Sequence, residues 1–125
     1  MMNEYFYDSY AVISYLNGSK NYEKYFKGCI GITTYYNVME VYYSVLKEEG
    51  EEKAMIVLKL LKTITFQPSY EDIPMVMVFR IKHSSKRYSY ADCLGYAISL
   101  RLGLKFLTGD EGFKSLLNVE FVKEN

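Results

Sequence analysis

Short apolar runs bounded by turn residues alternate along the chain with longer stretches in which apolar residues recur at helical spacing. The short runs predict buried strands, and the longer stretches predict helices with one apolar face. Strands that alternate with helices form a parallel sheet covered on both faces, so the pattern predicts an α/β fold. The expected strands cover residues 4–8, 29–33, 64–67, 105–108 and 119–122, and the expected helices cover 10–16, 22–27, 34–49, 51–61, 71–83, 89–102 and 112–117.

The clearest helix, turn and strand lie in residues 89–110. Ser89 is a suitable N-cap, Asp92 follows where a helix start favours negative charge, and Gly103 stands where a left-handed C-cap is expected. Residues 105–108 then form a short buried strand that ends at Asp110 in a glycine turn. Ligands of open α/β sheets bind at the carboxyl ends of the strands. We therefore expect the carboxylates of Asp92 and Asp110 to meet at that edge.

Composition narrows the class of protein. The chain has 125 residues, half of them hydrophobic, which is enough for one domain over residues 1–125 with a core of its own. Fifteen basic and fifteen acidic residues cancel, which argues against a broadly polycationic nucleic-acid coat. Cys29 and Cys93 have no zinc-type spacing and are interpreted as reduced packing residues. Because the sequence shows neither a signal-peptide pattern nor a run of ~18 uncharged apolar residues, we expect a cytoplasmic protein without a membrane span.

Three acidic residues each stand alone in a long uncharged stretch. They are Asp8 within residues 5–19, Glu40 within residues 28–46 and Asp92 within residues 88–100. An isolated ionised carboxylate is expensive to bury, so three of them without a local basic partner require another source of positive charge. A divalent cation supplies it, and oxygen ligands suit Mg²⁺ or Mn²⁺ rather than zinc. Together with Asp110, these residues predict a four-carboxylate metal site in one cleft.

The helix that carries Asp92 is also expected to face the cleft. Gly95, Tyr96 and Ser99 follow Asp92 at positions that share one helix face. This face is small and polar, which predicts room for the backbone of a substrate.

Four short motifs follow one another along the chain: Asp8-Ser9 after the first strand, Glu40 within residues 38–41, the Ser-x-x-Asp helix start at 89–92 and the Thr-x-Asp-x-x-Phe turn at 108–113. In this order they resemble the motifs of PIN-domain proteins, and among them those of the small VapC-type toxins of bacterial and archaeal toxin–antitoxin pairs. The resemblance spans nearly the whole chain. The first strand is shorter and more aromatic than usual, and Glu111 beside Asp110 makes the fourth ligand ambiguous.

The resemblance implies a PIN-like three-layer α/β/α sandwich with a central parallel sheet and a Mg²⁺- or Mn²⁺-dependent ribonuclease. Asp8, Asp92 and Asp110 would bind the metal directly or through water, and Glu40 would be a further ligand or would orient the attacking water. The hydroxyls of Ser9 and Thr108 would hold a carboxylate or a metal-bound water. The resemblance also implies an RNA substrate, a homodimer, and a small antitoxin protein that inserts a segment near the active site.

Each acid also has a structural interpretation. Asp92 fits a capping box, Asp8 can cap the following helix, Asp110 can be a turn residue, and Glu40 can point to solvent. Two other functions therefore stay open. One is a PIN-type nuclease of RNA processing or decay, and the other is a non-catalytic α/β binding or scaffold domain.

The sequence gives a less specific signal for the surface that would contact RNA. The charges in residues 73–91 are all positive, so this run can hold phosphates or can be a solvated helix face. His83 lies in it and is interpreted as a surface residue rather than a general base. A group of tyrosines in residues 35–43 is interpreted as core or as a subunit interface. The basic residues are Arg80, Lys82, Lys86 and Arg87, and the tyrosines are Tyr35, Tyr36, Tyr42 and Tyr43.

Overall fold

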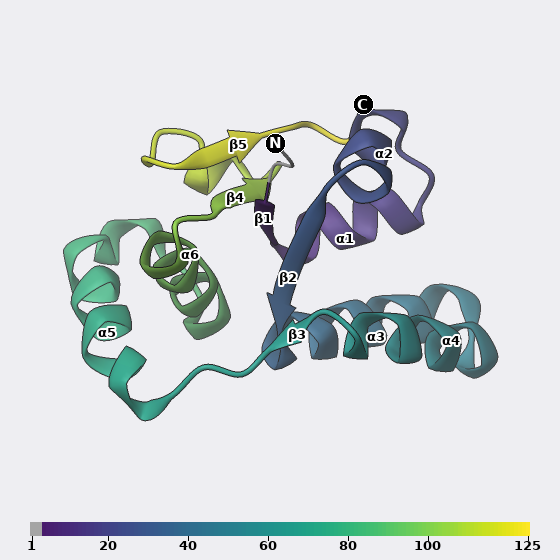
Figure 1. Cartoon of the computed structure of the whole chain (residues 1–125), viewed down its shortest axis with the longest axis horizontal. Coiled ribbons are helices and arrows are strands. Elements are labelled where there is room, and N and C mark those ends of the chain that lie inside the picture. The colour runs from purple at the N-terminus through teal and green to yellow at the C-terminus, as the bar shows by residue number, and fades with distance from the viewer. Residues whose placement is uncertain (1–3) are drawn as a thin grey trace.

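The computed structural model describes residues 4–125 of the protein. Within them, a parallel sheet with the strand order β3-β2-β1-β4-β5 stands between two groups of helices (Figure 1). The prediction of an α/β/α sandwich around a central parallel sheet is confirmed. The strands are β1 (Glu4–Tyr7), β2 (Ile30–Thr34), β3 (Thr65–Phe66), β4 (Lys105–Thr108) and β5 (Val119–Phe121).

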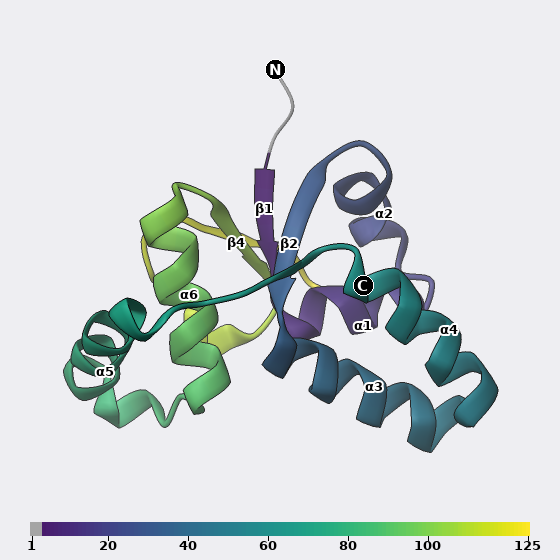
Figure 2. The ribbon, with the colours of Figure 1, turned by 60° about the horizontal axis from the view of Figure 1, so that its bottom comes forward.

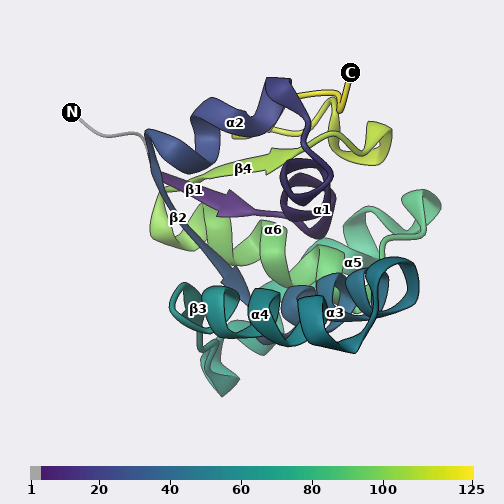
Figure 3. The same cartoon turned by 90° about the vertical axis from the view of Figure 1, so that its right-hand side faces the viewer.

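The helices form two layers. One layer, α5 and α6, covers one face of the sheet, and α1 to α4 lie on the other side (Figures 1 and 2). Figure 3 shows α6 and α1 against the sheet, with α3 and α4 side by side. The helices are α1 (Ser9–Leu16), α2 (Lys20–Lys27), α3 (Tyr35–Glu49), α4 (Glu51–Lys62), α5 (Ile73–Lys82) and α6 (Tyr90–Leu102), and the 3₁₀ turns are η1 (Tyr70–Asp72), η2 (Ser84–Lys86) and η3 (Glu111–Phe113).

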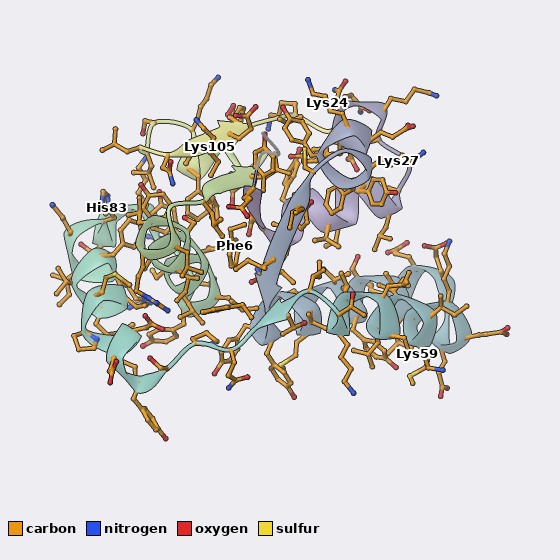
Figure 4. The ribbon with its side chains drawn as sticks, viewed as in Figure 1. Phe6, Lys24, Lys27, Lys59, His83 and Lys105 are labelled. Atoms are coloured by element: carbon orange, nitrogen blue, oxygen red, sulfur yellow. The ribbon has the colours of Figure 1, made fainter. Side chains whose placement is uncertain are left out.

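Strand β1 is buried on both faces, which explains its continuous aromatic sequence. Successive side chains of a strand point to opposite faces. Tyr5 and Tyr7 accordingly pack in the core under α1 to α4, and Phe6 packs in the core under α5 and α6. Phe6 lies at the centre of the molecule (Figure 4). A central strand between two helical layers needs apolar side chains at every position, so no polar alternation appears.

The ends of the helices follow the expected chemistry. The hydroxyl of Thr34 accepts a hydrogen bond from the backbone N–H of Asn37, so Thr34 is the N-cap of α3 and Asn37 completes its capping box. Gly103 ends α6 in the left-handed conformation, with φ of 70°. Gly50, with φ of 94°, separates α3 from α4. Glycine adopts positive φ values with little conformational strain, so these two helix ends could be predicted from the sequence.

Two expected helices differ from the structure, and so does the start of a third. The helix expected at 112–117 is only the turn η3, because Asp110 caps Gly112 locally and the chain then turns into β5. The helix expected at 71–83 divides into η1 and α5, with Pro74 in the first turn of α5, where its missing N–H is harmless. The helix expected at 10–16 begins one residue earlier, at Ser9, so Asp8 is the N-cap residue of α1 by position, without a side-chain capping bond. Among residues 4–125, no helix combines the length and the apolar character needed to cross a membrane.

Candidate functional site

The carboxyl ends of β1 and β4 bring Asp8 and Thr108 together. Tyr7 pairs with Leu107 in the parallel ladder, so the next residues, Asp8 and Thr108, also lie side by side. The backbone N–H of Asp8 donates to the carbonyl of Leu107 over 3.1 Å. Two segments that are far apart in sequence therefore meet at the sheet edge where α/β proteins bind ligands.

Asp8 is a buried carboxyl group in an acidic setting. Only 5% of the residue is exposed, and burial raises the pKa of its carboxyl group to about 7, with smaller contributions from the charges of Asp92 and Glu40. The hydroxyl of Thr108, which donates to Oδ2 over 2.6 Å, and the backbone N–H of Ser9 oppose this rise in pKa. Within residues 4–125, Asp8 has no ion pair. Its ionised form therefore has hydrogen-bond donors but no compensating charge.

Thr108 connects two of the predicted site residues. Its Oγ1 donates to Asp8 and accepts a hydrogen bond from the backbone N–H of Asp110 over 3.1 Å. Thr108 is fully buried. The hydroxyl therefore fixes the carboxylate at the end of β1 against the turn that carries Asp110.

Ser9 connects α1 to Glu40 on α3. Its hydroxyl donates to Glu40 Oε1 over 2.7 Å and accepts from Asn37 Nδ2 over 2.9 Å. The Oδ1 of Asn37 in turn accepts from the hydroxyl of Thr34 over 2.7 Å. Glu40 is largely exposed, but this chain of hydrogen bonds directs its carboxylate toward the edge of the sheet.

Asn37 is a site residue that was not identified from the sequence pattern. It is buried, with 2% exposure, and lies three residues before Glu40, on the same face of α3. A polar side chain at that spacing from a lone acid is the signal that identifies it.

Asp92 and Asp110 are each held by a nearby backbone donor. Asp92 Oδ2 accepts from the backbone N–H of Ser89 over 3.0 Å, and Ser89 Oγ accepts from the backbone N–H of Asp92, so the capping box is present. Burial raises the pKa of the Asp92 carboxyl group, and the charge of Asp110 adds to the rise. Asp110 Oδ1 accepts from the backbone N–H of Gly112 over 2.9 Å. The cap and turn interpretations therefore describe real contacts of these two residues, whereas the side chain of Asp8 makes no capping bond to α1.

The four acids influence one another electrostatically without forming a ready-made metal cage. The charges of Asp92 and Glu40 act on Asp8, and that of Asp110 acts on Asp92. However, no group of three or more His, Cys, Asp or Glu side chains within residues 4–125 is arranged to hold a metal ion. Glu40, Asp92 and Asp110 each accept a hydrogen bond, from the Ser9 hydroxyl and from the backbone N–H groups of Ser89 and Gly112 respectively. The donor set, all oxygen, fits Mg²⁺ or Mn²⁺, and the four-carboxylate site stays a prediction.

The face of α6 that follows Asp92 was predicted wrongly. Gly95 packs on β1, where an added Cβ would lie 2.8 Å from the ring of Phe6. Ser99 is fully buried and donates to the carbonyl of Tyr96 over 2.6 Å. This small face therefore allows close packing of α6 on the sheet rather than making room for a substrate.

A cavity of about 790 Å³ lies beside the acidic edge rather than at it. It runs between the residues that follow β3, the first turn of α5 and the start of α6. Ala91, next to Asp92, is among its lining residues, but none of the four acids is. At the acidic edge, Glu40 and Asp110 are exposed, whereas Asp8 is buried.

Three of the four tyrosines of α3 lie at the surface, and the fourth, Tyr42, is partly buried against the core under α1 to α4. Tyr35, Tyr36 and Tyr43 are more than half exposed, with exposures of 62%, 53% and 65%. The core interpretation is therefore wrong for these three, and the interface interpretation stays a prediction. Arg80 is exposed, with its guanidinium 4.3 Å from the centroid of the Tyr90 ring.

His83 and the cysteines take no part in the acidic edge. His83, at the outer end of α5 (Figure 4), is only partly buried and packs on the ring of Phe79 at 4.5 Å. Cys29 and Cys93 are both free thiols, and Cys93 is buried in the core.

The comparison with solved structures identifies the fold. No protein-family model and no curated protein sequence matches the chain. Among solved structures, the chain is similar to VapC20 of Mycobacterium tuberculosis, a toxin that cleaves the sarcin-ricin loop, with a TM-score of 0.76 and 16% identity over 95% of this chain and 99% of that one. It is similar to a toxin–antitoxin complex from Klebsiella pneumoniae, with a TM-score of 0.73 and 15% identity over 96% and 97% of the two chains.

A third similar structure is VapBC2 of Rickettsia felis, bound to a DNA fragment from its promoter. The TM-score is 0.69 and the identity 16%, over 95% of this chain and 97% of that chain. Identity this low establishes architecture and not activity. The resemblance read from the four motifs is thus confirmed at the level of architecture, and the chain has the PIN-like α/β/α fold of the VapC toxins.

Proposed function

We propose that the protein is a Mg²⁺- or Mn²⁺-dependent endoribonuclease and the toxin of a type II toxin–antitoxin pair. The observation that carries the proposal is Asp8. This carboxyl group is buried at the end of β1, is influenced by two other acids, and has no ion-pair partner within the described residues. Such an arrangement is costly for a purely structural role, and a bound dication would offset the cost.

The residues divide into three roles in this proposal. Asp8, Asp92 and Asp110 hold the metal directly or through water. Glu40, aimed by Ser9, is a further ligand or orients the attacking water. Thr108 holds the carboxylate of Asp8 in place. When bound, the metal lowers the pKa of water and neutralises charge on the phosphoryl oxygens.

The proposal is tested by metal titration and by the ends of the RNA products. Mg²⁺ or Mn²⁺ at millimolar concentration should raise the melting temperature, because the metal binds the folded state preferentially. Asp8→Asn and Asp92→Asn should abolish this rise and the cleavage of RNA, while the exposed Glu71→Gln serves as the matched control and should change neither. If a bound metal supplies water as the nucleophile in place of the RNA 2′-hydroxyl, the products would carry 5′-phosphate and 3′-hydroxyl ends. Products with 2′,3′-cyclic phosphates would exclude the mechanism.

Two features support the partners in this proposal, an antitoxin and a second copy of the chain. Two of the similar structures are toxin–antitoxin complexes. In addition, α3 and α5 expose large apolar side chains, as a protein interface would require. We propose a homodimer in the cytoplasm, and light scattering of the purified chain would show a monomer mass if this is wrong. The exposed residues include Tyr35, Tyr36, Met39, Tyr43, Ile73, Val78 and Ile81.

The alternatives give different outcomes. A nuclease of RNA processing or decay would show the same metal and product behaviour, but its expression alone would not arrest growth. A non-catalytic binding or scaffold domain would show an unchanged melting curve in millimolar metal and no cleavage.

A further inference from the structure

Two lysines surround one aromatic ring on β5, the strand at the edge of the sheet. The ammonium groups of Lys114 and Lys123 lie 5.2 Å and 5.5 Å from the centroid of the Phe121 ring. Lys123 is also 5.8 Å from the centroid of the Tyr10 ring. We call Lys114, Phe121 and Lys123 the β5 cluster.

The β5 cluster lies at the carboxyl ends of the strands, where the acids also lie. Phe121 pairs with Thr108 in the parallel ladder, so it stands at the carboxyl end of its strand, as Thr108 does. Lys123 Nζ donates to the carbonyl of Gly109 over 3.0 Å. Gly109 joins Thr108 to Asp110, so the cluster is in direct contact with the turn that carries a predicted metal ligand.

Tight packing at Gly109 keeps this arrangement in place. A Cβ added there would lie 2.3 Å from the ring of Tyr10 and 2.4 Å from the carbonyl of Val122. The backbone N–H of Val122 also donates to the carbonyl of Thr108 over 2.9 Å. Residues 122–124 continue toward α2 (Figure 1), where Asn21 Nδ2 donates to the carbonyl of Lys123 over 3.1 Å. The backbone that carries Lys123 is thus held on both sides.

The charges of the β5 cluster are not neutralised by the protein. Within residues 4–125, neither Lys114 nor Lys123 has an acidic side chain at ion-pair distance. Both lysines are exposed, and Phe121 is only partly buried. Two cations beside one accessible ring match a nucleic-acid strand, in which phosphates bind the cations and a base stacks on the ring.

We propose that the β5 cluster binds single-stranded RNA, with the backbone phosphates on Lys114 and Lys123 and one base on Phe121. The inference rests on the proposed ribonuclease function and adds the path of the substrate next to the Asp110 turn. This path differs from the one indicated by the basic run at residues 80–87, which covers the C-terminal end of α5 and η2 and leads into α6. An acidic segment of a protein partner is the competing occupant.

The test is the salt dependence of RNA binding, measured by fluorescence anisotropy with a short single-stranded RNA and EDTA present to prevent cleavage. Each phosphate contact on single-stranded nucleic acid contributes a slope of about −0.7 to the plot of log K against log salt. Lys114→Gln and Lys123→Gln should each reduce the slope by about this amount, and the double variant by about twice as much. Lys123→Arg should keep the slope, because it keeps the charge.

Two further variants separate the contribution of base stacking from that of charge. Phe121→Leu should weaken binding by about fivefold or more and leave the salt slope unchanged, because stacking does not release counterions. Lys105→Gln is the matched control. Lys105, labelled in Figure 4, is exposed and is the first residue of β4, so it lies at the amino ends of the strands, away from the β5 cluster. It should leave both affinity and slope unchanged.

The outcomes distinguish the two proposals. An unchanged slope in the Lys114→Gln/Lys123→Gln variant, or an equal loss with Lys105→Gln, would overturn the β5 cluster while leaving cleavage intact. Slopes that fall instead with Arg80→Gln and Arg87→Gln would place the RNA along the C-terminal end of α5 and the η2 turn, which also overturns the proposal. A wild-type chain that neither binds nor cleaves RNA would overturn the ribonuclease function itself.

Discussion

The hydroxyl of Thr108 donates a hydrogen bond of 2.6 Å to the carboxylate of Asp8, although the two residues are separated by 100 positions in the sequence. The same oxygen accepts the backbone N–H of Asp110. One side chain thus determines the relative placement of two predicted metal ligands. Its position follows from the parallel pairing of β1 with β4, so the geometry of the site is built into the sheet.

Thr108→Val should raise the pKa of Asp8 further and reduce metal affinity. The substitution removes the hydroxyl that favours the ionised carboxylate and leaves the N–H of Asp110 without its acceptor. Loss of a buried hydrogen-bond partner costs roughly 1–3 kcal/mol. Urea denaturation and calorimetric titration with Mn²⁺ would measure both effects. Thr108→Ser keeps the hydroxyl and should preserve metal affinity, so equal losses in the two variants would contradict the role assigned to Thr108.

The metal-free protein should lose stability as the pH rises from about 5 to about 8. The folded-state pKa of Asp8 is raised from 3.8 to about 7, so between these values the folded state binds a proton that the unfolded state has released. Stability then falls with rising pH, and the contribution present at low pH is lost through the folded pKa. At about 1.4 kcal/mol per pKa unit, the change is on the order of a few kcal/mol. Asp92, whose pKa burial also raises, acts in the same direction.

Thermal unfolding in EDTA at several pH values tests this dependence. Asp8→Asn removes the titrating group, so its melting temperature should be nearly flat over the same range. Excess Mg²⁺ should restore the stability of the wild-type protein at high pH, because it replaces the proton as the compensating charge. A wild-type protein that becomes more stable between about pH 5 and about pH 8 would contradict the raised pKa of Asp8.

The sequence predicted the strands and the principal helices because their signals are local. Gly103, the Ser89 capping box and the aromatic run of β1 each act within a few residues. The face of α6 was predicted wrongly because a residue distant in the sequence packs against it. The small side chains suggested room for a substrate, but the space beside Gly95 is filled by the ring of Phe6. Asn37 was missed as a site residue for the same reason, since its partner Ser9 lies 28 positions away.

The individual acids were easier to find than their arrangement. Asp8, Glu40 and Asp92 are conspicuous because each is the only charge in its stretch of sequence. The direction of the Glu40 carboxylate depends on Ser9, 31 positions away, and that of the Asp8 carboxylate depends on Thr108, 100 positions away. Sequence patterns contain no such orientation, so the metal geometry could not be predicted from them.

Ser9→Ala should destabilise the protein and release Glu40. Without the hydroxyl, the buried amide of Asn37 loses an acceptor, at a cost of roughly 1–3 kcal/mol, and Glu40 loses the donor that orients it. Glu40→Gln is the informative partner, because its amide oxygen can still accept from Ser9 while the charge is gone. It should therefore keep stability near wild type but lower metal-dependent cleavage. If Glu40→Gln cleaves RNA at the wild-type rate, Glu40 has no part in the reaction.

Gly95→Ala should destabilise the fold without changing the chemistry of the acids. The new Cβ would lie 2.8 Å and 2.9 Å from two carbons of the Phe6 ring, at the contact between α6 and β1. Overpacking of a dense core costs about 1–3 kcal/mol, which outweighs the gain in helix propensity of about 1 kcal/mol. Gly28→Ala is the matched control, because its Cβ would meet only the Lys24 carbonyl at 3.4 Å. Urea denaturation should show the loss for Gly95→Ala alone, while the rise in melting temperature on adding Mn²⁺ persists in both variants. A Gly95→Ala protein with wild-type stability would mean that α6 can move away from the sheet, and its effect on the position of Asp92 would then appear as a weaker response to the metal.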